Sequence, residues 1–315
     1  MRKCIFIFLP LSVILTVTGI WFFANNRARN IVDERIAEAL ASGAYDEITY
    51  ESLNILPNGD VELQNLTVEA EGLRYTLQDI SVRNLDYVHE LPWHLTVEVN
   101  GIHFPEGLPA DTDNPAAYDL LRSLISDSNI PLNLVYGYNY DPDQMHQIDT
   151  SGTISLPQFF RLGISTITRN IPLETMAGNA SLYADPLSNA TLLGTTDENA
   201  ALVSASMTLN DEGIVESVIA LMAQRSGVPP EDFRNLLVSQ SRNFYLFAPQ
   251  TAQNLAMNLG SQLATFLEGG RELSVSVEPQ MEGRIMQLQG EIMGAAFTGD
   301  FDRIADLLNL QVQAL

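Results

Sequence analysis

The four histidines are the first residues to test for metal or acid–base chemistry, and two of them lie close together in HELPWH at 89–94. Two histidines can hold zinc from one face of a helix when they are four residues apart. His89 and His94 are five residues apart, and Pro92 would break a helix between them. We therefore expect these histidines at strand ends, without a metal ion.

A second acidic stretch, DPDQMHQID at 141–149, places carboxylates where a calcium loop needs its first, third and ninth ligands. His146 occupies the position that requires glycine in such a loop, and no glutamate follows at the twelfth position. The stretch is therefore predicted to be a hairpin turn. His103 and His146 are isolated, and no Gly-x-Ser-x-Gly elbow is present for a hydrolase that would use one of the four histidines.

The turn Asp211-Glu212-Gly213 could hold paired carboxylates at a strand end, but helix capping explains the same residues. Apolar residues recur at helical spacing after Gly213, so Asn210 or Asp211 is predicted to cap a helix that has Glu212 in its first turn. Gly227 is predicted to end that helix, and Pro230 to begin the next. We assign no catalytic, cofactor-binding or metal-binding residue, and we expect a protein that is not an enzyme.

The charge of the chain limits its partners. Residues 1–30 carry four basic residues and no acid, so the rest carries 12 basic and all 39 acidic residues, a net charge of −27. Such a body repels phosphate backbones, and nucleic-acid binding is not expected. Lys3 is the single lysine, which excludes Schiff-base chemistry from the body, and Cys4 is the single cysteine, which excludes an intrachain disulfide.

The N-terminus is predicted to be a transmembrane anchor. Residues 4–24 hold no charge, and 21 residues in a helix span about 31 Å, which matches the hydrocarbon core of a bilayer. Trp21 and the two phenylalanines after it stand where an aromatic belt would be. A cleaved signal peptide is the alternative, but Phe22 would occupy a cleavage position that requires a small residue.

The charges on the two sides of the anchor are nearly balanced, so the positive-inside rule does not decide the orientation. A short N-terminus before a long acidic body favours residues 1–3 as a cytoplasmic tail. In a bacterium this orientation predicts an inner-membrane protein, single-pass, with its C-terminal body in the periplasm.

The residues that follow the anchor change from helical to strand periodicity. Residues 30–42 predict a short amphipathic connecting helix whose buried side includes Ile31, Ile36, Ala37 and Leu40. Residues 45–105 alternate apolar and polar side chains, with a slip near Asn65, a hairpin at PNGD (57–60) and a turn at Gly72. We expect them to form an antiparallel meander.

The rest of the chain predicts a β-rich region over 45–209 and an α+β region over 210–315, as one continuous body. A helix is expected at 111–129, and strand-like runs follow, including LNLVYGYNY, NASLYA and ALVSASMTL. Helices are expected at 212–225, 230–242 and 250–268, strands near 272–278 and 285–296, and a final helix before a terminal strand QVQAL. The predicted fold class is α+β, with the helix-rich C-terminal third packed on the sheet.

An anchor that leads directly into a β meander containing LPNGDVELQNLTV resembles the AsmA-like group of bacterial envelope proteins. Their strands often carry an apolar-x-Gly-x-apolar-x-apolar pattern, as at Pro57-Asn58-Gly59-Asp60-Val61-Glu62-Leu63. The resemblance covers residues 1–105 and implies a periplasmic β-rich body with a role in envelope maintenance and lipid traffic through an apolar groove. The helical C-terminal third is not part of this pattern, and no site residue is carried over.

These observations predict a membrane-anchored envelope protein whose periplasmic body binds an apolar ligand or a protein partner. A scaffold module of an envelope complex and an unrecognised hydrolase are the alternatives. An open apolar sheet face would favour a lipid ligand, whereas a sheet covered by the C-terminal helices would favour a scaffold.

Overall fold

The structure is a computed structural model, and it divides the chain into two compact units. The first unit comprises residues 1–140 and 172–192, and the second comprises 141–171 and 193–315. The residues that the structure describes are 25–56, 59–70, 72–86, 88–89, 92–103, 131–171, 200–279 and 285–315. The predicted anchor at 4–24, the helix at 111–129 and the strand NASLYA lie outside these residues. Within them, no helix is long and apolar enough to cross a membrane.

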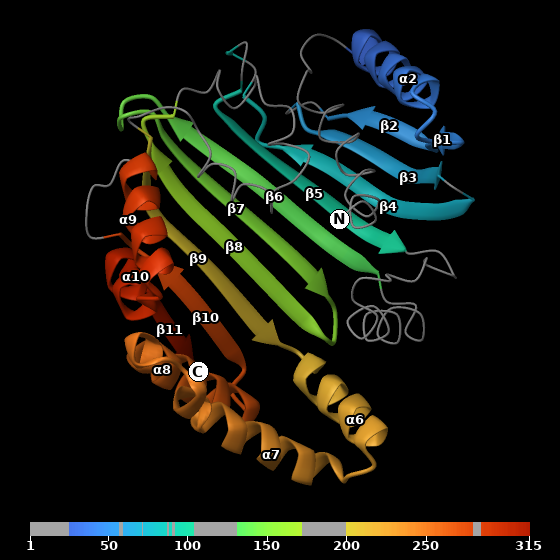
Figure 1. Ribbon diagram of the computed structural model, residues 1–315. Helices are drawn as coiled ribbons and strands as arrows, with labels where there is room; N and C mark the ends of the chain where they lie inside the picture. The colour runs from blue at the N-terminus through green and yellow to red at the C-terminus, as the bar shows by residue number, and fades with distance from the viewer. Residues whose placement is uncertain are drawn as a thin grey trace. The chain divides into compact units, whose positions relative to one another are not determined.

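Antiparallel strands form the first unit, as the alternation of residues 45–105 predicts (Figure 1). The order of neighbours is β1-β3-β4-β5-β6, and β2 also pairs with β3. Gly59 and Gly72 have φ of 91° and 74° in the turns on either side of β3, which confirms the predicted hairpin at 57–60 and the predicted turn at Gly72. The bounds are β1 Glu47–Thr49, β2 Ser52–Ile55, β3 Val61–Ala70, β4 Leu73–Arg83, β5 His94–His103 and β6 Leu132–Asp141.

A crease crosses β3, β4 and β5 at the place where the sequence predicts a slip. Asn65, Gln78 and Gly101 stand at the same level of the register, and Asn65 and Gly101 have φ of 51° and 72°. Two adjacent residues of β3, Gln64 and Asn65, are both exposed there, and apolar residues are buried again beyond them. The pairing of β3 with β4 continues across the crease without a shift in register. The change of backbone direction at the crease therefore keeps the apolar residues of β3 on one face of the sheet on both sides of Asn65.

Helix α2 (Asn25–Ala41) packs against the first strands and begins five residues before the predicted start at residue 30. Val32 is 3% exposed and packs with Leu53, and Ile36 is partly buried beside them. Ala37 was predicted on the buried side but is exposed, whereas Val32 was not included. The hydroxyl of Tyr50 donates to Asp33 Oδ1 at 2.7 Å. The helix therefore contacts the protein body.

The second unit contains antiparallel strands in the order β7-β8-β9-β10-β11. Strand β8 was not included in the sequence prediction, and where it pairs with β9 the extra residue Val203 of β9 makes a bulge opposite Ile167 and Thr168. Strand β9 crosses the predicted boundary at 209/210, and the prediction that both regions form one continuous body stays a prediction. The bounds are β7 Gln147–Leu156, β8 Phe160–Arg169, β9 Ala201–Asp211, β10 Glu272–Val277 and β11 Gln311–Ala314.

The helices of the second unit follow the predicted order with one correction. Residues 285–296, predicted as a strand, belong to helix α9, because Ile285, Leu288 and Ala295 recur at helical spacing and are its buried residues. The predicted helices at 212–225, 230–242 and 250–268 are confirmed, as is the final helix. The bounds are α6 Ile214–Ser226, α7 Pro230–Arg242, η2 Phe244–Phe247, η3 Gln250–Ala252, α8 Gln253–Leu267, α9 Ile285–Thr298 and α10 Phe301–Leu308.

Helix α8 lies along the outer edge of the sheet, next to β11 (Figure 1). The backbone N–H of Ala314, in this edge strand, donates to the side chain of Gln262 on α8 at 2.8 Å. An edge strand with unpaired N–H groups invites pairing with other chains, and the helix protects it.

The first turn of α8 has no cap from its own N-terminal residue. Asp302 on α10 accepts hydrogen bonds from the backbone N–H groups of Asn254 and Leu255 at 3.3 and 2.8 Å. A residue distant in sequence thereby satisfies two helix N–H groups that would otherwise lack a partner.

Candidate functional site

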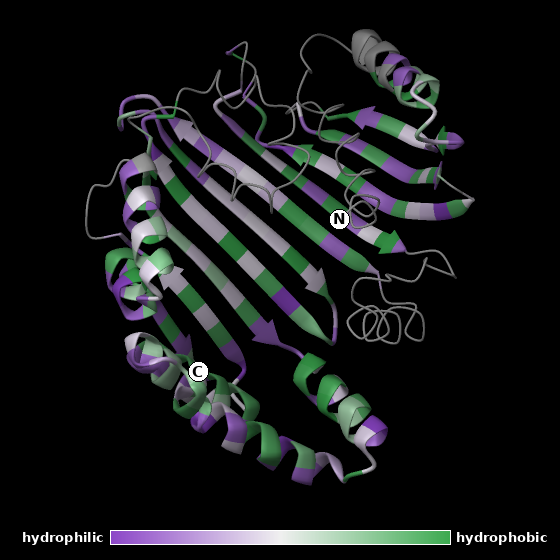
Figure 2. Ribbon diagram, viewed as in Figure 1, coloured by the Kyte–Doolittle hydropathy of each residue, from purple (hydrophilic) through white to green (hydrophobic). Residues whose placement is uncertain are grey.

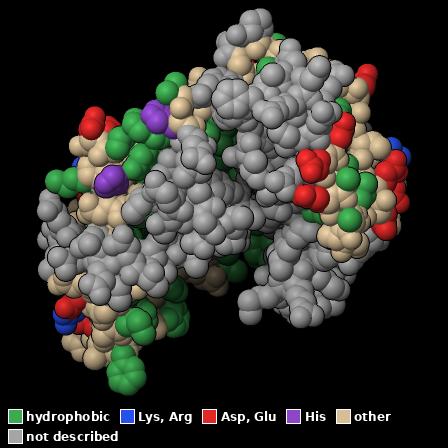
Figure 3. Space-filling view, turned by 90° about the horizontal axis from the view of Figure 1, so that it is seen from above, with side chains coloured by type: hydrophobic (Ala, Val, Ile, Leu, Met, Phe, Trp, Pro, Cys, Tyr) green, Lys and Arg blue, Asp and Glu red, His purple; other side chains and the backbone are tan. Residues whose placement is uncertain are grey.

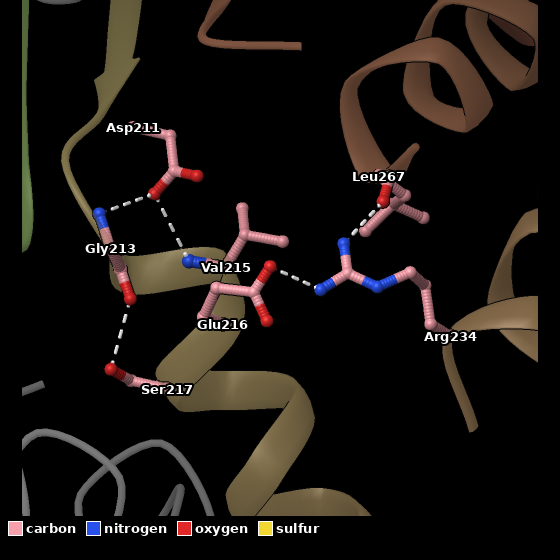
Figure 4. A network of polar contacts seen from close by, with 7 residues as sticks. All are labelled: Asp211, Gly213, Val215, Glu216, Ser217, Arg234 and Leu267. Carbon is pink, nitrogen blue, oxygen red and sulfur yellow. Dashed lines mark hydrogen bonds and ion pairs between the residues drawn. The ribbon is translucent and has the colours of Figure 1, made fainter. Parts of the chain in front are cut away.

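The acidic turn at Asp211 is a helix cap (Figure 4). Asp211 Oδ1 accepts hydrogen bonds from the backbone N–H groups of Gly213 and Val215 at 2.9 and 3.2 Å. Gly213 has φ of 139°, and a Cβ there would stand 2.7 Å from the carbonyl oxygen of Gln158. Glu212 precedes α6, and the acid in the first turn is Glu216 instead. The capping prediction is confirmed for Asp211, and Glu212 is corrected.

Arg234 ties three helices together in the same region (Figure 4). Its guanidinium forms an ion pair with Glu216 of α6 and donates to the carbonyl oxygen of Leu267, at the end of α8, at 2.7 Å. A cation at a helix C-terminus interacts favourably with the helix dipole. Asp211 thus caps α6, and Arg234 joins α7 to α6 and α8. Both charged side chains therefore have structural roles.

Asp86 and His89 form the tightest polar contact among the described histidines. Asp86 is 6% exposed and accepts hydrogen bonds from the backbone N–H groups of Val88 and Trp93 at 2.8 and 3.0 Å. His89 Nδ1 stands 2.5 Å from Asp86 Oδ2, and the imidazole stacks on Trp93 with ring centroids 3.7 Å apart. Tyr140 meets Trp93 edge to face at 6.0 Å. These contacts fix the loop between β4 and β5 onto β6.

The electrostatics of Asp86 follow from these contacts. Burial of the carboxyl group acts to raise its pKa, but the two backbone N–H groups and His89, by its hydrogen bond and charge, act in the opposite direction. Their combined effect lowers the pKa of Asp86 from 3.8 to about 2. Asp86 therefore stays ionised and buried at neutral pH, held by three donors.

The other polar candidates remain separate. His94 lies at the start of β5, as predicted, whereas His89, also predicted at a strand end, lies in the loop between β4 and β5. His103 lies at the other end of β5 and contacts Gln78 through its Nε2 at 3.0 Å. Asp141 accepts hydrogen bonds from the backbone N–H groups of Asp143 and Gln144 at 3.0 and 3.3 Å, which confirms the predicted turn. Among the residues that the structure describes, no three potential metal ligands come together.

The most distinctive surface is a face of the second unit's sheet. Residues paired in register point to the same face of a sheet, so the pairing of β7 to β11 defines rows across five strands. Two neighbouring rows hold only apolar side chains and one glycine, which we call the apolar strip (the hydrophobic bands in Figure 2). These rows are Ile154, Leu162, Leu209, Leu273 and Ala314, and Gly152, Ile164, Met207, Val275 and Val312.

The opposite face of the same strands carries hydroxyl and amide groups. Its rows are Thr153, Gly163, Thr208, Ser274 and Gln313, and Ser151, Ser165, Ser206, Ser276 and Gln311. Ser165 and Ser206 join across β8 and β9 with their Oγ atoms 2.8 Å apart. In these four rows one face is apolar and the other carries hydroxyl and amide groups, which is the pattern of a sheet with one face against water. Beyond the strip, Thr150 and Thr166 lie on the same face as the strip.

The apolar strip is much less buried than the equivalent residues of the first unit. Val97 and Val99 are 0% exposed in β5, and Ile80 is 2% exposed in β4. In the strip every side chain remains partly accessible, and Met207 is 45% exposed. Four steps of about 4.8 Å between neighbouring strands give the strip a length of roughly 19 Å. Partly exposed apolar surface of this extent is typical of an interaction site.

One comparison with known protein families gives a match. A family model described as "Uncharacterized protein" matches residues 153–315. The chain belongs to this family. The matched region contains every residue of the apolar strip except Gly152, together with the helices from α6 to α10. No curated protein and no solved structure matches the chain.

The sequence analysis did not identify the apolar strip as a surface. ALVSASMTL was recognised as a strand, and its alternation of Ser204, Ser206 and Thr208 with apolar neighbours already separates two faces. The missing information was the register that aligns the apolar residues of five strands. The Asp86–His89 contact was also missed, although Asp86 stands three residues before His89.

Proposed function

We propose that the protein is a non-enzymatic, single-pass membrane protein of the bacterial envelope that holds an aliphatic ligand, a lipid acyl chain, on the apolar strip. Residues 4–24 anchor it in the inner membrane, and the body extends into the periplasm. The single observation that carries the ligand is the strip itself, ten positions across five strands without a charged or hydrogen-bonding side chain.

The composition of the strip favours an acyl chain over a protein partner. Binding hot spots in protein interfaces are enriched in Trp, Tyr and Arg, and the strip contains none of them. Branched aliphatic side chains and Met207 offer only dispersion contacts and removal from water, which suit a flexible hydrocarbon. Each methylene of a bound chain that leaves water contributes about 0.8 kcal/mol.

The AsmA-like resemblance of residues 1–105 is in accord with this proposal. That group's expected lipid traffic requires an apolar surface protected from water. The acidic body adds a second constraint, because a net charge of −27 disfavours anionic ligands approaching through water. A lipid whose headgroup is uncharged, or is kept away from the acidic surface, therefore fits this protein better than an anionic lipid.

The test is the binding of a fluorescent fatty acid to the full chain held in an amphipathic polymer, with empty polymer as the blank. Met207→Gln places an amide in the strip at its most exposed position, so the fold tolerates it. Losing about 1 kcal/mol of apolar contact weakens binding about fivefold.

Thr208→Gln is the matched control, because its side chain lies on the hydroxyl face of the same strand. Its binding is expected to stay within about twofold of the unmodified protein. Equal losses in both variants, or binding that does not saturate in the unmodified protein, would refute the acyl-chain site. A stoichiometric protein recovered by cross-linking through the strip would favour the scaffold alternative instead.

A further inference from the structure

Two segments of the second unit present exposed apolar side chains at the surface. On α9, Met293 is 72% and Phe297 is 95% exposed, and their spacing of four residues places them on one side of the helix. Phe301, which begins α10, is 42% exposed. In η2, Phe244, Leu246 and Phe247 are 53%, 62% and 84% exposed. These six residues are called the aromatic patch.

Hydrogen bonds connect η3 and α8, which follow η2 in the chain, to the residues around the turn from α9 to α10. The hydroxyl of Thr251, just after η2, donates to the carbonyl oxygen of Gly299, between α9 and α10, at 2.6 Å. Asp302, next to Phe301, accepts from the first turn of α8 through Asn254 and Leu255. The exposed side chains thus protrude from a fixed framework, and hydrophobic side chains stand out from the surface in Figure 3.

The chemistry of the patch fits a bilayer. Single side chains that are 84% and 95% exposed would need a separate pocket each in a protein partner, whereas fluid acyl chains adapt to any protruding shape. The nearby charges are paired, Arg303 with Glu291 and Arg242 with Glu268, each at 2.7 Å. A region with paired charges inside an acidic body does not attract anionic headgroups, so zwitterionic lipid is the matching surface.

We propose that the aromatic patch inserts into the interface of a zwitterionic bilayer and brings the second unit into contact with membrane lipid. This inference rests on the proposed function, because contact with a bilayer gives the apolar strip access to acyl chains. It adds a second membrane contact, on α9 and η2, to the anchor at the N-terminus.

The test places a fluorescent label on the patch of the full chain in phosphatidylcholine nanodiscs. A Cys4→Ser background makes Phe297→Cys the single labelling site. Lipids that carry bromine on their acyl chains quench a label that enters the hydrocarbon. Quenching at 297 is expected to exceed that of a control label at Gln311→Cys, on the hydroxyl face of β11, by about fivefold.

Equal quenching at the two positions, whether strong or absent, would overturn the inference. Adding Phe247→Glu to the labelled protein is expected to remove the quenching, because both segments enter together. Replacing a third of the lipid with phosphatidylglycerol is expected to weaken quenching, and an increase would contradict the choice of zwitterionic lipid. No ligand is added, so the result stands independently of fatty-acid binding to the strip.

Discussion

Asp86→Asn removes the buried carboxylate that fixes the loop between β4 and β5. The carboxyl group has a pKa of about 2 in the folded protein against an ordinary value of 3.8. Each unit of difference corresponds to about 1.36 kcal/mol, so the ionised group contributes about 2 kcal/mol to the stability of the fold. Val88 and His89 of the same loop are exposed, so solvent screening makes this an upper value.

The sign of the pH dependence follows from the lowered pKa. The unfolded chain binds a proton at Asp86 before the folded protein does, so the contribution is fully present above pH 4 and is lost as the pH falls towards 2. The free energy of unfolding of the unmodified protein should therefore exceed that of Asp86→Asn by about 2 kcal/mol at neutral pH. This difference should shrink steadily between pH 4 and pH 2.

Urea unfolding followed by tryptophan fluorescence measures this difference. Trp93 stacks on His89 and reports on the loop itself, and a Trp21→Phe background leaves it as the only tryptophan. Asp46→Asn is the matched control, because it removes an equal charge from an exposed position of the first unit. A difference between the protein and Asp86→Asn that is constant from pH 7 to pH 2 would refute the reasoning, as would an equal effect of Asp46→Asn.

Two further substitutions test the framework of each unit by urea unfolding, followed by circular dichroism for the second unit because it contains no tryptophan. Asp302→Ala removes the two hydrogen bonds to the first turn of α8 and should lower stability by about 1 kcal/mol, whereas Asp306→Ala, exposed on the same helix, should change it little. An equal effect of both would show that the cap does not stabilise α8. Gly101→Ala should cost at least about 1–2 kcal/mol, because φ is +72° and the new Cβ would stand 2.5 Å from Gln78. Gly290→Ala is the control on α9, where a new Cβ meets open space, and it should stabilise the protein by about 0.5–1 kcal/mol. A Gly101→Ala variant more stable than the unmodified protein would contradict the requirement for glycine at the crease.

Local patterns in the sequence predicted the strands and hairpins of the first unit well. Gly59 and Gly72 mark turns because few other residues adopt a positive φ, and the slip at Asn65 shows as a break in alternation. The strand predicted at 285–296 was wrong. Short apolar pairs such as Ile285 and Met286 fit both the helical period and the strand period over a few residues. In the folded protein Ile285 and Leu288 are both buried, and their spacing of three residues fits one side of a helix.

The candidate site depended on information that no local pattern contains. A single strand such as β9 shows that one side is apolar, but the strip exists only because Leu162, Leu209 and Leu273 fall in one row of the register. The cap of α8 by Asp302 joins residues nearly 50 positions apart. The partial exposure of Met207 depends on which elements cover the sheet, and α8 lies at its edge.

The central claim is that the apolar strip holds an acyl chain, and photo-cross-linking of a diazirine-labelled fatty acid to the full chain in native membranes tests it most directly. Peptide mass spectrometry then locates the labelled residues. The account predicts labelling on β8, β9 and β10 at strip residues such as Ile164, Met207 and Val275, with neighbouring Ser165, Ser206 and Ser276 unlabelled. Labelling confined to residues outside the strip, or spread equally over both faces of these strands, would contradict it.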